Sequence, residues 1–146
     1  MQIKIRRVHV DAIIPEYATA GAACFDLHTI NPLIVRAGDS EIARTGLAFE
    51  MPPGYVMLVH SRSGHGFKNS VRLANCTGVI DSDYRGEVMI KLHNDHSILS
   101  QNKQMVFQAG DRIAQAMLVP VMPCEFVEGE LTQTDRGEGG FGSTGQ

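Results

Sequence analysis

The sequence has little of what marks several common protein classes. Its three cysteines, Cys24, Cys76 and Cys124, are odd in number and form no CxxC pair, so neither a disulfide framework nor a zinc or dithiol motif is expected. The six histidines include no HExxH pair of a zinc hydrolase. A net charge of −3 argues against the basic face of a nucleic-acid-binding protein, so any phosphate must bind locally.

Long apolar runs are absent as well. Residues 1–10 contain Lys4, Arg6 and Arg7, but no apolar stretch long enough for a signal peptide follows them. No later stretch approaches the length of a membrane span. We therefore expect a protein that contacts no membrane and stays in the compartment where it is made. The unpaired thiols favour a reducing cytoplasm.

The patterns that are present indicate β structure. A chain of 146 residues with 43% hydrophobic and 20% charged residues is typical of one globular domain. Residues 61–68 could form one or two helical turns, and residues 112–118 fit either a helix or a strand. Runs rich in β-branched residues that alternate in polarity predict strands at 3–10, 33–35, 42–49, 55–60, 88–93 and 119–121. Turns with Gly, Pro and Asp separate them, which predicts an all-β sandwich or barrel.

The C-terminal residues differ in composition from the rest. After Pro123 the chain becomes acidic and polar, and it ends in RGEGGFGSTGQ, which has too few apolar side chains to form a core. Gly137, Gly139 and Gly142 fit GxGxxG, but no helix follows, so a dinucleotide-binding motif is rejected. The segment is either a disordered tail or a strip whose amides, together with Arg136, wrap phosphate oxygens.

A second motif, NCTGVIDSDYRGE at 75–87, predicts a hairpin. Asp81 could act there as a general base, and Tyr84 could place its ring against a sugar. An ordinary acidic turn accounts for the same residues.

Three further segments carry weaker signals. SRSG at 61–64 could present amides, hydroxyls and Arg62 to an anion, or it could be a capped loop with a surface arginine. Asp26 in AGAACFDL could simply end a strand, and Gln115 in GDRIAQ could hydrogen-bond buried backbone.

Taken in their order along the chain, the five segments resemble the five motifs of the trimeric dUTP pyrophosphatase (dUTPase) family over nearly the whole chain. In that order they are AGAACFDL, SRSG, NCTGVIDSDYRGE, GDRIAQ and RGEGGFGSTG. The resemblance implies an all-β, distorted jelly-roll-like barrel or sandwich with at most one short helix. It implies a β-barrel catalytic core at 1–126 and a flexible C-terminal arm at 127–146 that closes over a neighbouring active site. It also implies a homotrimer with shared sites and Mg²⁺ as cofactor. The implied reaction hydrolyses dUTP to dUMP and pyrophosphate, which limits uracil incorporation into DNA and supplies dUMP for dTMP synthesis.

The resemblance also implies roles for individual residues. Asp81 would activate the water that attacks the α-phosphorus, Tyr84 would pack on deoxyribose, and Asp26 would hold Mg²⁺ through its water shell. Asn75 and the Gly78 backbone would read uracil. The full set of implied substrate-binding residues is Arg62, Ser63, Gly64, Asn75, Gly78, Tyr84, Gln115, Arg136, Phe141, Gly142, Ser143 and Thr144.

The sequence departs from the family pattern at two places. Cys24 stands where glycine is common, which suggests that the backbone there does not need a positive φ. His65-Gly66-Phe67 follows SRSG where small or aliphatic residues are usual. His65 near the phosphates could make binding pH-sensitive, but we expect its ring to face solvent. Two alternatives to a dUTPase are a dCTP deaminase-like enzyme of the same fold, which would carry a glutamate at the base-reading site, and a regulatory nucleotide-binding relative.

Overall fold

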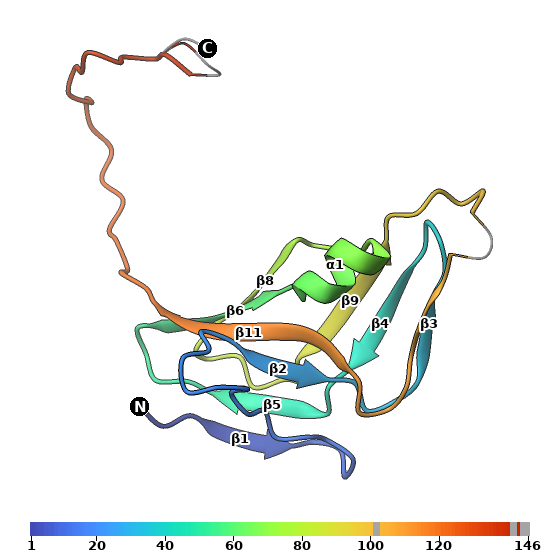
Figure 1. The fold of residues 1–146 in the computed structure, drawn as a ribbon. Coiled ribbons are helices and arrows are strands. Elements are labelled where there is room, and N and C mark those ends of the chain that lie inside the picture. Colours follow the sequence, from blue (N-terminus) through green and yellow to red (C-terminus); the bar gives the residue numbers. More distant parts are fainter. Residues whose placement is uncertain (101–102, 141–142, 144–146) are drawn as a thin grey trace.

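The computed structural model describes residues 1–100, 103–140 and 143 (Figure 1). Within these residues the chain forms eleven strands and one helix, so the predicted all-β class with at most one short helix is confirmed. The elements are β1 (Lys4–Arg7), β2 (Phe25–His28), β3 (Leu33–Val35), β4 (Ser40–Arg44), β5 (Leu47–Glu50), β6 (Tyr55–His60), α1 (Ser63–Asn69), β7 (Val71–Leu73), β8 (Thr77–Ile80), β9 (Met89–Asn94), β10 (Met105–Phe107) and β11 (Arg112–Pro120).

Two larger antiparallel sheets form most of the body. One has the strand order β2-β11-β6-β8 and the other the order β4-β9-β7, while β1 pairs with β5 and β3 with β10. The chain therefore crosses from one larger sheet to the other between β7 and β8, and again between β8 and β9. The described sheets stay open and do not close into a barrel, so the jelly-roll-like sandwich is the supported form of the predicted fold.

Side chains from both larger sheets share one hydrophobic core. Leu27 and Val59 enter it from the first sheet, and Ile90 and Leu92 enter it from the second. In β9 the buried side chains alternate with exposed ones, as expected for a strand with one face on the core. Each such side chain stabilises the fold by roughly 1.5–3 kcal/mol relative to its exposed state. The core thereby fixes the strands that carry the polar residues described below.

The predicted strand at 42–49 is broken in the structure. β4 ends at Arg44 and β5 begins at Leu47, because Gly46 between them adopts a φ of +68°. A Cβ added at Gly46 would lie 2.9 Å from the Cβ of His9, so the turn has no room for a larger residue. The predicted strands at 33–35 and 55–60 have the observed bounds.

Residues 112–118, which fitted either a strand or a helix, belong to β11. The ladder between β11 and β2 shifts register between Arg112 and Ala114, and the consecutive Ile113 and Ala114 are both buried. This irregularity breaks the strict alternation of a strand and imitates helical spacing. The helix expected at 61–68 is α1, which ends at Asn69 and is followed by the C-cap Ser70 with a left-handed φ of 54°.

After β11 the chain leaves the sheets and extends away from the body (Figure 1). Residues 121–138 are exposed and form no helix or strand. Val121 N–H donates to the Gly54 carbonyl at 2.9 Å, and the residues after it form no strand or helix that packs on the body. No helix among the described residues is long and apolar enough to cross a membrane.

Candidate active site

Residues of the segments AGAACFDL, SRSG and GDRIAQ meet at one cavity. Its volume is about 380 Å³, and we call it the Asp26 cavity. Antiparallel pairing creates the meeting, because Gln115 on β11 lies opposite Asp26 on β2 and opposite His60 at the end of β6. The sequence-predicted residues that line the cavity are Asp26, Arg62, Ser63, Gly64 and Gln115.

Two arginines hold the Asp26 carboxylate. Arg62 Nε donates to Oδ1 at 2.9 Å, and Arg112 Nη1 lies 3.3 Å from Oδ2. The Asp26 side chain is only 18% exposed, so these charge-assisted contacts are partly shielded from water. Arg112 was not among the predicted site residues, although it stands three positions before Gln115 in GDRIAQ. The cavity therefore contains one carboxylate and two guanidinium groups. This combination suits an anionic ligand that brings a bound metal ion with it.

The charges of the cavity also act on His28, which follows Asp26 on the same strand. Burial lowers the pKa of His28, Asp26 opposes this shift, and Arg112 and Arg62 reinforce it. The ring is therefore held neutral at pH 7 and adds no charge beside the cavity.

The expectation of a solvent-facing ring at His65 is wrong. Its Nε2 lies 2.7 Å from the carbonyl oxygen of Arg112, and its ring packs edge-on against Phe107 with centroids 5.1 Å apart. The same Nε2 lies 3.2 Å from Arg62 Nη1, so this nitrogen faces one acceptor and one donor, and the shorter contact is with the acceptor carbonyl. His65 thus ties the start of α1 to the start of β11. The sequence signal for it was the departure from the family pattern after SRSG.

Gln115 and Cys24 complete the cavity wall. Gln115 Nε2 donates to the Ser61 carbonyl at 3.0 Å, which joins β11 to the residue before Arg62. Cys24 has no positive φ, so its departure from glycine causes no backbone strain, as inferred from the sequence. Burial, with the Asp26 charge, raises the pKa of the Cys24 thiol and keeps it protonated.

A second cavity of about 430 Å³ contains the base-reading candidates. Asn75 and Gly78 line it together with Val59 and Lys91, and we call it the Asn75 cavity. A Cβ added at Gly78 would lie 3.2 Å from the Cβ of Val59, so glycine allows β8 to pack closely on β6 here. The walls are mostly apolar with a few polar groups, as is common for a site that takes a flat heterocycle.

The predicted hairpin at 75–87 is not formed as a ladder. β8 pairs with β6, whereas β9 pairs with β4 and β7, so the two strands flanking the loop belong to different sheets. The Asn75 cavity lies where β8 and β9 diverge. The sequence could not distinguish a hairpin from this arch, because both need two strands joined by an Asp- and Gly-rich loop.

The loop between β8 and β9 carries Asp81 and Tyr84. Asp81 is exposed, and its carbonyl accepts a turn hydrogen bond from Tyr84 N–H at 3.2 Å. The Tyr84 hydroxyl donates to the Glu87 carbonyl at 3.1 Å. A Cβ added at Gly86 would clash with the Tyr84 phenol, so glycine lets the ring fold back over the loop.

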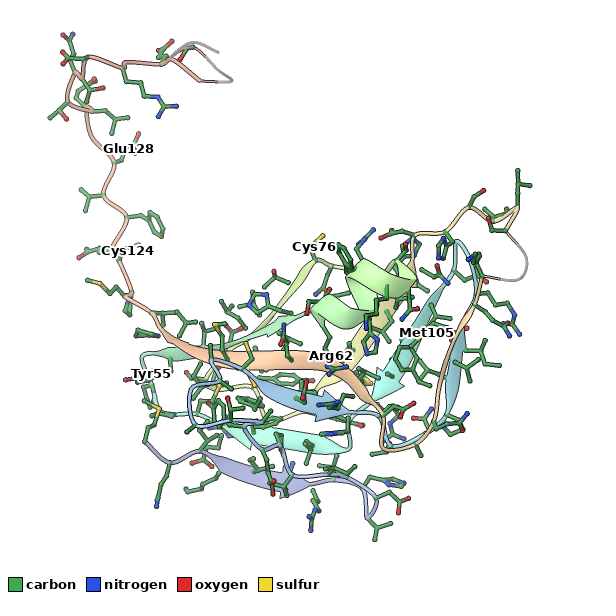
Figure 2. The ribbon with its side chains drawn as sticks, in the orientation of Figure 1. Tyr55, Arg62, Cys76, Met105, Cys124 and Glu128 are labelled. Atoms are coloured by element: carbon green, nitrogen blue, oxygen red, sulfur yellow. The ribbon has the colours of Figure 1, made fainter. Side chains whose placement is uncertain are left out.

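Within the described chain, no residue lines both cavities, and Asp81 and Tyr84 line neither. Arg136 on the C-terminal segment hydrogen-bonds within its own turn, where its Nε donates to the Gly139 carbonyl at 2.8 Å. Figure 2 shows Cys124 and Glu128 along that segment, away from Arg62 and Cys76. Ser143 is exposed, and Phe141, Gly142 and Thr144 lie outside the described residues. One copy of the chain therefore brings the predicted site residues together only in separate groups.

The described residues include no cluster of three or more His, Cys, Asp or Glu side chains that could bind a metal by themselves. Asp26 supplies the one carboxylate of its cavity. This donor set fits a hard cation that arrives on a phosphate chain and keeps most of its waters, as Mg²⁺ does.

Solved structures share this fold. The dUTPase of Staphylococcus bacteriophage 80alpha, solved with dUpNHpp, superimposes with a TM-score of 0.91 at 26% identity over 99% of both chains. The dUTPase of phage phi11 of S. aureus, studied for the coordination of a structural Mg(II) ion, superimposes with a TM-score of 0.83 over 90% of this chain and 98% of that one. It is 23% identical, so it supports the fold alone. The class defined by the fold is thus that of the jelly-roll-like dUTPases.

Sequence comparisons establish the family. A family model described as dUTPase matches residues 10–145. The deoxyuridine 5'-triphosphate nucleotidohydrolase of Nautilia profundicola is 45% identical over 147 residues and is covered along its whole length, as is this chain. The chain belongs to the dUTPase family.

Proposed function

We propose that the protein hydrolyses dUTP to dUMP and pyrophosphate at sites built by more than one copy of the chain. Membership of the dUTPase family and the full-length relative named a deoxyuridine 5'-triphosphate nucleotidohydrolase support the reaction. The dUpNHpp in the phage 80alpha structure supports the substrate. The dCTP deaminase-like and regulatory alternatives gain no support from these relatives.

The observation that carries the shared site is the separation of the two cavities. The Asp26 cavity offers two arginines and the Ser63 hydroxyl for phosphates, and the Asn75 cavity offers a mostly apolar slot for a nucleobase. A single nucleotide needs both, yet no described residue lines the two together. Rotational symmetry can place one copy's Asn75 cavity beside another copy's Asp26 cavity. A homotrimer with shared sites is therefore the proposed assembly.

At the phosphate end, Arg62 and Arg112 neutralise negative charge while Ser63 and the Gly64 amide donate hydrogen bonds. Mg²⁺ carried by the triphosphate would supply further charge neutralisation at the reacting phosphate. Asp26 is the residue of this chain that would hold that ion, through its water shell, since it is the one carboxylate lining the cavity.

Asp81 is the proposed general base. Its exposed carboxylate takes a proton from water, the water oxygen bonds to the α-phosphorus, and the bond to the bridging oxygen of pyrophosphate breaks. Since Asp81 lies outside both cavities, it reaches the phosphorus only when a second copy supplies the phosphate-binding side.

The base and sugar would occupy the Asn75 cavity and its rim. The Asn75 side chain and the Gly78 backbone would hydrogen-bond uracil, and Tyr84 would pack on deoxyribose where a 2′-hydroxyl would clash. Such a slot leaves no space for the methyl group of thymine and leaves cytosine with mismatched partners.

The C-terminal arm at 127–146 would close over a neighbouring copy's site, while residues 1–126 form the catalytic core. Arg136, Ser143 and Thr144 would bind the terminal phosphate, the Gly142 backbone would approach the nucleotide, and Phe141 would cover uracil. Residues 127–138 of the arm are exposed and form no helix or strand, which supports a binding place on another copy.

Co-expression of two inactive variants tests the shared site. Arg62→Ala removes a phosphate-binding arginine, and Asp81→Asn removes the proposed general base. If each site takes these residues from different copies, random mixing leaves about one quarter of the sites with both wild-type residues. Pyrophosphate release from dUTP should then recover to about a quarter of wild type. The control is the assembly of the Arg62→Ala, Asp81→Asn double variant alone, in which every site lacks both residues. No recovery in the mixed assembly would contradict the shared site.

A further inference from the structure

The Asp81–Tyr84 loop is held at one end by the turn between β4 and β5. Residues 81–88 belong to no strand, so ladder hydrogen bonds do not fix them. At their end, Val88 N–H donates to the Leu47 carbonyl at 2.9 Å, and the Val88 carbonyl accepts from Thr45 Oγ1 at 2.6 Å. Val88 is therefore clamped from both sides by the β4–β5 turn.

Glu87 extends this clamp through its side chain. Its Oε1 accepts from the Gly46 N–H at 2.8 Å, and its Oε2 accepts from Arg44 Nη2 at 2.8 Å and from Arg44 Nε at 3.1 Å. The Glu87 side chain is 15% exposed, whereas that of Arg44 is 50% exposed. A carboxylate so placed, with two charge-assisted bonds and one backbone donor, is fixed in a single position.

The backbone of the same residue receives the Tyr84 hydroxyl. Tyr84 Oη donates to the Glu87 carbonyl at 3.1 Å, and Gly86 between them leaves room for the ring. The position of the Tyr84 ring therefore depends on where the Glu87 carbonyl stands. That carbonyl is fixed in turn by the Glu87 carboxylate and by Val88.

We propose that Glu87 is a positioning residue for Tyr84 and thereby sets the preference of the site for deoxyribose over ribose. The inference rests on the proposed function, in which Tyr84 packs on the sugar. Glu87 touches no substrate in this account. It acts by holding the phenol at the distance from the sugar where a 2′-hydroxyl does not fit.

The test compares dUTP with UTP for four variants. Glu87→Ala removes every hydrogen bond of the Glu87 side chain, and Glu87→Gln keeps an amide oxygen for Gly46 N–H but loses the charge facing Arg44. Arg44→Ala removes the exposed partner and keeps the carboxylate. Glu50→Gln is the matched control, because Glu50 forms an exposed pair with Lys4 at 2.9 Å and lies outside the proposed machinery.

We expect the ratio of kcat/KM for dUTP to that for UTP to fall roughly 5- to 50-fold in Glu87→Ala, since small misplacements of a positioning group have effects of this order. The same ratio for Glu87→Gln and Arg44→Ala should lie between the values of Glu87→Ala and wild type, and the ratio for Glu50→Gln should equal that of wild type. If Glu87→Ala does not fold, the two milder variants decide.

A purely structural role would lower Tm and reduce both kcat/KM values equally. If the wild-type protein hydrolyses dUTP but the Glu87 and Arg44 variants keep its ratio of kcat/KM for dUTP to that for UTP, the positioning role alone is overturned. A wild-type protein inert toward dUTP would overturn the proposed function instead, so the two failures are distinguishable.

Discussion

Arg62 and Asp26 form a 2.9 Å ion pair that joins two segments 36 residues apart in the sequence. Each lines the Asp26 cavity, and each is partly buried, with 22% and 18% of its side chain exposed. The pair neutralises part of the Arg62 charge in the absence of a phosphate. If the proposed metal-bound triphosphate binds here, it has to compete with the Asp26 carboxylate for Arg62.

Asp26→Asn should weaken the use of Mg²⁺ more than the use of dUTP. If Asp26 holds the hydrated ion, the Mg²⁺ concentration for half-maximal pyrophosphate release should rise roughly 10- to 100-fold, the usual scale for an outer-sphere ligand. Titration of activity with Mg²⁺ at saturating dUTP measures it. Asp95→Asn is the control, because Asp95 is also paired with an arginine, Arg72 at 2.8 Å, but does not line the cavity. An unshifted Mg²⁺ requirement in Asp26→Asn would remove Asp26 from the metal site.

Asp81→Asn should separate binding from turnover. The amide keeps the shape of the side chain but cannot accept the proton from water, so kcat should fall by roughly two to four orders of magnitude. Affinity for dUpNHpp, measured by calorimetry, should stay close to wild type. Turnover near the wild-type rate would refute the general-base assignment.

Truncation before Arg136 should leave the fold intact and nearly abolish activity. Residues 127–138 are exposed and form no helix or strand, so Tm and the oligomeric mass in solution should hardly change. Loss of the phosphate donors on the arm should lower kcat/KM at least roughly 100-fold, by analogy with removal of one oxyanion donor. Loss of the assembly on truncation would instead make the arm a structural element.

His65→Ala should raise KM for dUTP about 3- to 10-fold, since one hydrogen bond, that to the Arg112 carbonyl, is lost. His65→Gln retains an N–H donor and should recover part of the loss. Phe67→Ala on the same helix is the control, because Phe67 is 94% exposed. Equal kinetics for His65→Ala and Phe67→Ala would show that the contact does not shape the cavity.

Glu87 should make the fold sensitive to acid. Burial by itself would raise the pKa of Glu87, but the hydrogen bonds from Arg44 and Gly46 N–H, with the Arg44 charge, bring the pKa below its ordinary value of 4.5. A carboxyl with a lowered folded-state pKa stabilises the fold above its unfolded pKa, and that stabilisation is lost as the pH falls through the folded pKa. Between about pH 6 and pH 3, Tm should therefore fall more steeply in wild type than in Glu87→Gln. Parallel curves would contradict this role.

Local sequence indicated the helix at 61–68 and strands such as β3 and β6, but it left residues 112–118 of the longest strand, β11, open between helix and strand and gave no strand at β7 or β10. Tyr55–His60 is a six-residue run with four consecutive apolar residues, bounded by the Pro-Pro-Gly turn before it, which is enough to indicate a strand. β7 (Val71–Leu73) and β10 (Met105–Phe107) have three residues each and acquire their conformation from pairing with distant strands. Local propensity carries little information over so few residues.

The sequence by itself determined the family, the all-β class and the identity of the chemical groups, because motif residues such as Asp81 and Arg62 are local and are read directly. Only the tertiary structure decided which of those groups meet. It paired Asp26 with Arg62, directed His65 inward to Arg112, and placed Asn75 in a separate cavity. These contacts depend on strand register and on crossings between sheets, which long-range packing sets and no local pattern records.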